Sequence, residues 1–172
     1  TPYVTEEHVK LDLGVFAQDQ WTINHLTVNA GVRFDYLDSY VPAQSLPPVQ
    51  FVGARNFAAI PDVPNWQDVT PRLGASYDLF GTGKTALKVS AGKYLQGITT
   101  LIAGAVNPVI TSVNSASRSW GDTNQDFAPN CDLSNPLANG ECGAISPTTF
   151  GQTAVTTRYD PDVLTGWGKR RY

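Results

Sequence analysis

The feature that most constrains this chain is a strict alternation of apolar and polar residues between positions 26 and 36. Successive side chains of a β-strand point to opposite faces, so a period of two predicts a strand with one apolar and one polar face. The apolar members are Leu26, Val28, Ala30, Val32, Phe34 and Tyr36. Such a strand needs an apolar environment on one side and a polar one on the other.

Three more segments alternate in the same way, and together they predict strands over about residues 8–21, 26–37, 68–79 and 85–95. Only a few residues separate the first two strands and the last two strands, so each pair is expected to form an antiparallel hairpin. Pairing Trp21 with Leu26, and Leu79 with Thr85, places the apolar residues of both strands of each hairpin on one face.

The connections between the hairpins are long, covering about residues 38–66 and 96–165, and they are rich in Pro, Asn, Ser and Gly. A compact soluble domain rarely carries such loops. Short turns alternating with long loops are typical of outer-membrane barrels, in which the turns are periplasmic and the loops extracellular. We therefore predict an all-β chain, 1–172, forming one partial barrel domain of about four strands whose remaining strands are missing.

The composition agrees with a membrane setting. Charged residues make up 16% of the 172 residues, where about a quarter is usual in soluble proteins. The net charge of −3 and the lack of a basic block argue against nucleic acid as a partner. No apolar run is long enough for a transmembrane helix. The chain contains no Met, so we expect it to begin inside a longer protein.

The two faces of the predicted strands receive different roles in a barrel. Lipid would contact Val9, Leu11, Leu13, Val15, Leu26, Val28, Val32, Leu73, Leu87 and Val89. An aromatic girdle at the two membrane surfaces would contain Trp21, Tyr36, Trp66, Phe80 and Tyr94. The lumen would be lined by Lys10, Asp12, Arg33, Asp35, Arg72, Asp78, Lys88 and Lys93. A soluble β-sandwich, with a second sheet covering the apolar faces, is the alternative.

The second long loop contains two features of chemical interest. Cys131 and Cys142 lie in a polar stretch, which favours a disulfide formed in an oxidising compartment over two unrelated thiols. Asp122, Asn124 and Asp126 offer hard oxygens at alternating positions, as Ca²⁺ ligands do. An EF-hand is excluded because its required Gly and Glu positions are Phe127 and Leu133, so these residues form either a looser Ca²⁺ site or polar turns.

No catalytic set is visible in the sequence. The unit Gly83-Lys84-Thr85 suggests a phosphate-binding loop, but Asp78 stands where that motif requires Gly, and a strand pattern follows in place of a helix. The two histidines, His8 and His25, lie at opposite ends of the first predicted strand and cannot share a metal. We expect no enzymatic activity and, apart from loop Ca²⁺, no cofactor.

The hairpin sequences resemble those of one known family. Residues 14–21 (GVFAQDQW) followed by 26–36 (LTVNAGVRFDY) resemble a barrel hairpin of TonB-dependent receptors. Residues 70–78 (TPRLGASYD) followed by 83–88 and 92–94 resemble another. The loop over 120–143 is similar to that of the Oar-like branch, whose members carry a carboxypeptidase-regulatory-like N-terminal domain.

The resemblance implies a barrel of about 22 strands around a plug, in the outer membrane of a Gram-negative bacterium. The implied function is uptake of a large solute, energised by TonB. The implied partners are outer-membrane lipid, the rest of the barrel and its plug, TonB through that plug, and an extracellular solute. The alternatives are an outer-membrane adhesin or surface-assembly protein with partner-binding loops, and a soluble secreted β-sandwich binding module.

Overall fold

The computed structural model describes residues 4–170, so the ends of the predicted domain, residues 1–3 and 171–172, lie outside the described part. Where the sequence predicted one domain, the contacts divide the chain into two compact units. The sheet unit consists of Val9–Ser39, Asp62–Thr100 and Asp160–Tyr172. The loop unit consists of Thr1–His8, Tyr40–Pro61 and Leu101–Tyr159. The predicted long connections thus contribute a compact unit of their own.

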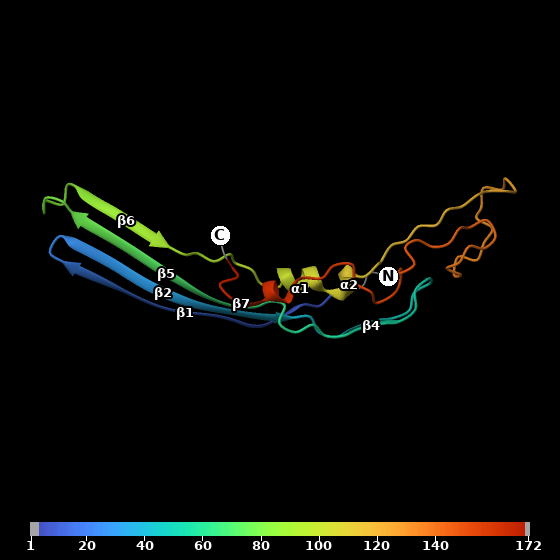
Figure 1. Cartoon of the computed structure of the whole chain (residues 1–172), viewed down its shortest axis with the longest axis horizontal. Helices are drawn as coiled ribbons and strands as arrows, with labels where there is room; N and C mark the ends of the chain where they lie inside the picture. Colours follow the sequence, from blue (N-terminus) through green and yellow to red (C-terminus); the bar gives the residue numbers. More distant parts are fainter. Residues whose placement is uncertain (1–3, 171–172) are drawn as a thin grey trace. The chain divides into compact units, whose positions relative to one another are not determined.

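Four long strands run side by side in the sheet unit, in the order β1-β2-β5-β6 (Figure 1). They are β1 (His8–Ile23), β2 (Leu26–Tyr40), β5 (Asn65–Asp78) and β6 (Ala86–Gly92). A short strand, β7 (Thr165–Trp167), follows the helical turn α3 (Pro161–Leu164) and pairs with β5 in parallel. The predicted fold class, an antiparallel sheet of hairpins, is confirmed.

The second hairpin has the predicted register. The amide of Leu79 donates to the carbonyl of Thr85 at 3.0 Å, and Tyr77 lies opposite Leu87. Between the hairpins, β2 and β5 pair so that Ala30 lies opposite Leu73. Odd positions of β5 and β6 therefore share one face with even positions of β2, and the apolar residues form a continuous surface across three strands.

The first hairpin differs from its predicted pairing. Strand β1 continues to Ile23, and the turn contains only Asn24 and His25. Asn24 has a φ of 53°, a left-handed conformation that Asn tolerates, so two residues suffice for the turn. The hydroxyls of Thr22 and Thr27 lie 3.3 Å apart, which indicates a register two residues away from the predicted one. A register shift of two residues leaves each side chain on its predicted face of the sheet.

The alternation of β1 is broken near its first residues. Asp12 lines a cavity with Arg33 on the polar face. Lys10 nevertheless places its Nζ 2.8 Å from Oδ2 of Asp38, which lies on the apolar face of β2. Residues two apart in a regular strand share a face, so a β-bulge between Lys10 and Asp12 is indicated. Lys10 is therefore not on the predicted lumen side, and Val9 no longer shares the face of the later apolar residues.

The loop unit contains regular structure where the sequence predicted only loops. Strands β3 (Gln44–Leu46) and β4 (Arg55–Phe57) pair as a small antiparallel hairpin, and two short helices follow later, α1 (Leu101–Val106) and α2 (Pro108–Thr111). Helix α2 begins because Asn107 caps it, its side chain accepting from the amide of Val109 at 3.0 Å. None of the helices within residues 4–170 has the length and hydropathy of a membrane span.

Candidate functional site

The polar face of the sheet is hollowed. A cavity of about 810 Å³ lies against the middle of the sheet. Its walls come from β1, β2, β5 and β6, and include the polar residues Gln18, Asn29, Arg33, Thr70, Arg72 and Ser90 together with apolar ones such as Phe16, Val32 and Leu73. The six polar residues occupy the polar positions of the alternation. The sheet therefore has a concave polar side, as the inner wall of a barrel does.

Ion pairs lie on this polar face. Asp35 lies directly opposite Asp68 on the neighbouring strand, an arrangement that is unfavourable for two uncompensated carboxylates. Arg33 contacts Asp35 at 2.9 Å, while Lys93 and Arg170 contact the fully buried Asp68 at 3.3 and 3.2 Å. Three cations thus contact the two carboxylates, and such partners offset the cost of taking a carboxylate out of water.

The apolar face carries large side chains that protein does not cover. Leu73, Leu87 and Val89 are 57%, 59% and 63% exposed. Contiguous exposed apolar surface of this kind marks a membrane or partner contact, because a water-facing sheet would not retain it. By the observed register the predicted lipid-facing residues of the last three long strands share this face: Leu26, Val28, Val32, Leu73, Leu87 and Val89.

The aromatic residues separate into two groups. Trp21 and Phe80 are exposed beside the short turns, and Tyr77, which the sequence analysis omitted, joins them on the apolar face. At the other end of the strands, Tyr36 lies half-buried on the apolar face. These four residues have the placement of a girdle.

Two predicted girdle residues lie elsewhere. Trp66 is 5% exposed, lies opposite Leu37, and its Nε1 donates to the carbonyl of Val163 at 2.8 Å. Tyr94 lies beneath the guanidinium of Arg72, 5.0 Å from Cζ to the ring centroid, on the polar face. Both side chains are thus used for contacts within the protein, because a buried indole N–H and an unpaired guanidinium each need a partner.

The loop unit contains a disulfide between Cys131 and Cys142, whose Cα atoms are 5.8 Å apart. Arg118 ties the same segment together by donating to four backbone carbonyls, those of Gly143, Asn135 and Leu137 at 2.7–2.9 Å and that of Asp132 at 3.4 Å. Without an apolar core of its own, this segment is held by a covalent link and by charge-assisted hydrogen bonds.

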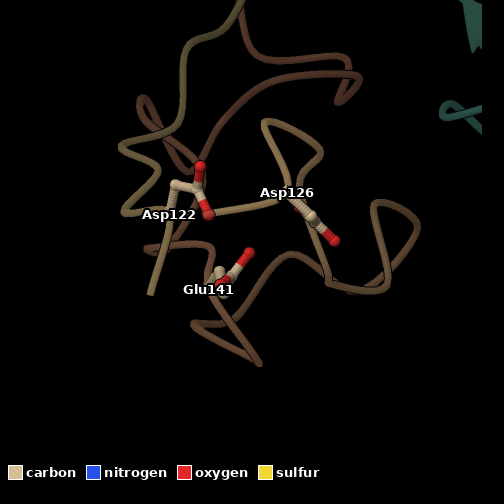
Figure 2. A group of neighbouring side chains, drawn as sticks. All are labelled: Asp122, Asp126 and Glu141. Carbon is tan, nitrogen blue, oxygen red and sulfur yellow. The ribbon is translucent and has the colours of Figure 1, made fainter. Parts of the chain in front are cut away.

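The predicted Ca²⁺ ligands have a different set of neighbours from those expected. Carboxylate oxygens of Asp122, Asp126 and Glu141 lie within 4.8 Å of one another, although Glu141 is far along the chain. Figure 2 shows these three side chains as neighbours. Asn124 contacts this group by donating its side-chain amide to Asp126 at 3.0 Å. Asp122 and Asp126, two of the predicted ligands, thus lie beside Glu141, a carboxylate that the sequence did not predict.

The carboxylates of this cluster accept hydrogen bonds from the loop itself. Asp122 accepts from the amides of Gln125 and Phe127 at 2.7 and 3.0 Å. Glu141 accepts from the amide and hydroxyl of Thr123 at 2.8 and 2.6 Å. These bonds, with another from the amide of Asn130, lower the pKa of Glu141 to about 2. The cluster therefore orders the loop through ionised carboxylates.

Comparison with known proteins identifies the family of this chain. A family model described as "Outer membrane beta barrel domain" matches residues 2–168. This chain belongs to the outer membrane β-barrel domain family. The two-faced sheet with exposed aliphatic residues on one side is therefore a portion of such a barrel domain.

A curated relative places this barrel domain near transporters. The chain is 28% identical over 124 residues to a protein named TonB-dependent transporter Oar, from Myxococcus xanthus. The match covers 72% of this chain and 10% of that protein, so the chain spans about a tenth of its relative's length. No solved structure matches the chain. The predicted relation to TonB-dependent transporters is confirmed as a distant homology.

The sequence did not predict two sets of contacts, those of Glu141 and those between Asp68 and Arg170. Glu141 lies far from the Asp122 motif, and its only sequence signal is its position beside a cysteine. Asp68 and Arg170 form a buried pair at 3.2 Å across most of the chain. The alternation of the strand predicts that Asp68 lies on the polar face, but no sequence pattern predicts that Arg170 is its partner.

Proposed function

We propose that this chain forms part of the membrane-spanning wall of a TonB-dependent outer-membrane transporter that takes up a large solute. The observation that carries the proposal is the concave polar face, with its cavity of about 810 Å³, set behind an aliphatic face that no protein covers. The distant homology to a TonB-dependent transporter supports the same reading.

In this proposal the two faces meet different solvents. The aliphatic face of β2, β5 and β6 contacts lipid, where a charged side chain at mid-depth costs about 2–4 kcal/mol. The polar face lines the lumen, where charged side chains such as Arg33 and Lys93 meet water, and these cations contact the buried Asp35 and Asp68. The short turns after Ile23 and Asp78 face the periplasm, and the loop unit faces the outside.

The remaining partners follow from closure of the barrel. Strands β1 and β6 are the two ends of the long-strand order and need neighbours, because bacterial barrels contain at least about eight strands. The rest of the same barrel supplies them, together with a plug through which TonB acts. Solute is captured by the loops and passes through the lumen when the plug moves. We expect no enzymatic step.

The test uses the complete gene product that contains this chain. Cells are fractionated, and the protein is examined for detergent dependence and for a mobility shift on heating, as folded barrels show. Uptake of candidate solutes is then measured with and without TonB. Outer-membrane recovery with TonB-dependent uptake is the expected result.

Two other outcomes would overturn the proposal in different ways. Outer-membrane recovery with a surface phenotype that is independent of TonB would indicate an adhesin or surface-assembly protein. Recovery as a soluble secreted protein would reassign the aliphatic face to the core of a β-sandwich.

A further inference from the structure

The loop unit contains a cavity that the barrel wall does not explain. Its volume is about 580 Å³, within the range of about 300–1,000 Å³ usual for small-molecule sites. Four segments build it: the N-terminal segment around Glu6, the hairpin of β3 and β4, the residues that follow α2, and the stretch around Phe150. All four belong to the loop unit, so the cavity is complete within it.

The lining of this cavity is mainly apolar. Its apolar lining residues include Leu46, Val49, Phe51, Val52, Val113 and Phe150. The tip of the hairpin is closed by reciprocal hydrogen bonds between Val49 and Val52, at 2.8 and 3.2 Å. Val49 and Phe51 are nevertheless about half exposed, so the hairpin holds apolar side chains at an open space without covering them. Apolar surface held open in this way favours an apolar ligand.

One cation stands in this apolar wall. Arg55 lies opposite Leu46 in the β3–β4 hairpin and lines the cavity. Its Nη1 donates to neutral oxygens only, those of Asn114 at 3.0 Å and Ser112 at 3.5 Å, and its buried Nε has no partner. By contrast, Arg33 and Arg170 of the sheet unit each contact a carboxylate.

The acidic residue at the cavity does not supply the missing countercharge. Glu6 lines the cavity, but its Oε2 lies 3.6 Å from Nε2 of His8. No ion pair joins Glu6 or any other carboxylate to Arg55 among residues 4–170. A half-buried guanidinium without a countercharge is stabilised by an anion that also shields it from water.

We propose that this cavity binds a molecule with an apolar chain that ends in a carboxylate, such as a medium-chain fatty acid. The carboxylate pairs with the Arg55 guanidinium, and the hydrocarbon lies along the apolar hairpin and Phe150. The inference stands on the loop unit alone. Only a role for this cavity in capturing solute before transport rests on the proposed function.

The test measures binding to the complete protein, reconstituted in lipid nanodiscs, with a fluorescent dansyl-labelled fatty acid as the probe. Decanoate, decanol and decyl phosphate compete for the site. We expect decanoate to displace the probe at least about tenfold more effectively than decanol, since a charge-assisted hydrogen bond contributes about 1.5–3 kcal/mol. Equal competition by decanol and decanoate would overturn the proposal. Stronger competition by decyl phosphate would overturn the carboxylate as head group.

Two variants and one control locate the site. Arg55→Gln should weaken decanoate about tenfold and leave decanol unchanged. Val49→Trp should fill the cavity and weaken both. Arg158→Gln, an exposed arginine of the loop unit that does not line the cavity, should change neither. Decanoate affinity that survives both cavity variants would overturn the assignment. Resistance of the loop unit to limited proteolysis, compared with that of the unaltered protein, shows that each variant is folded.

The same protein separates this inference from the proposed function. Decanoate binding that depends on Arg55, in cells that show no TonB-dependent uptake, would support the cavity and overturn the transporter. TonB-dependent uptake without decanoate binding would support the transporter and overturn the cavity as a binding site.

Discussion

The sheet unit and the loop unit reach order by different means. In the sheet unit a repeating pattern fixes each residue's role, because position parity decides which face a side chain occupies, as at Leu73 and Gly74. In the loop unit single residues hold distant segments together, as Asn107 does for Glu7 and Gln44. Folding of the sheet unit should therefore be sensitive to a charged residue placed on the apolar face. Folding of the loop unit should be sensitive to the loss of a few individual side chains.

The largest effect is expected on the apolar face of the sheet unit. Leu73→Arg should prevent recovery of folded barrel, because a cation facing lipid near mid-depth costs about 2–4 kcal/mol. Asn29→Arg is the matched control: Asn29 lies opposite Gly74 on the polar face, one position away from the pair of Ala30 and Leu73. Heat-modifiable mobility in outer-membrane fractions is the measurement. Similar losses in both variants would contradict the assignment of faces.

The next effect is expected in the loop unit. Replacing Cys131 and Cys142 by Ser removes a link between residues 11 apart, which contributes about 2–3 kcal/mol if chain entropy dominates. Limited proteolysis should then cut residues 118–143 faster, while the heat-modifiable mobility of the barrel stays unchanged. Loss of the barrel itself would show that the two units are not ordered independently.

A smaller effect should follow from one buried amide. Asn107 is fully buried, and its side chain donates to Glu7 at 2.7 Å and accepts from Gln44 at 3.2 Å. Asn107→Ala leaves these groups without a partner, so we expect a loss of about 1–3 kcal/mol in the stability of the loop unit. Hydrogen exchange of the loop amides is the measurement. Asn56→Ala, at an exposed position of β4, should have no effect.

The smallest effect should be a dependence on acid. The pKa of Glu141 is lowered to about 2 by the hydrogen bonds from Thr123 and Asn130. The stabilising contribution is complete above the ordinary value of 4.5 and is lost as the pH falls toward about 2. Pepsin cleavage of the loop, relative to an unstructured peptide, should accelerate in that window. Glu141→Gln should cleave faster at pH 5 and vary less with pH, and an unchanged pH profile would exclude Glu141 as the source.

The sequence predicted the sheet well because its signal is local and repeated. The pairing of Leu79 with Thr85 followed from parity and loop length alone. The first hairpin lies two residues away from its predicted register, because Asn24 adopts a positive φ and a turn of two residues then suffices. The bulge near Lys10 was missed because alternation looks unbroken in the letters even where the backbone inserts an extra residue.

The loop unit was largely beyond sequence reasoning. Short helices such as α2 and α3 begin at Asn107-Pro108 and Asp160-Pro161, which are recognisable start signals, but their lengths give no periodicity to detect. Glu141 joins Asp122 only because the chain folds back on itself, and no spacing rule relates positions so far apart. The cavity at Arg55 likewise depends on four segments that are distant in sequence.

The bulge near Lys10 has a consequence for how genes of this family can change length. A single-residue insertion or deletion before the bulge alters only the sidedness of the residues that precede it, which is already reversed relative to the rest of β1. The same change between Asp12 and Trp21 would turn Leu13 and Val15 into the lumen and bring polar side chains to lipid. Single-codon length variation among relatives should therefore be tolerated up to the bulge and absent beyond it.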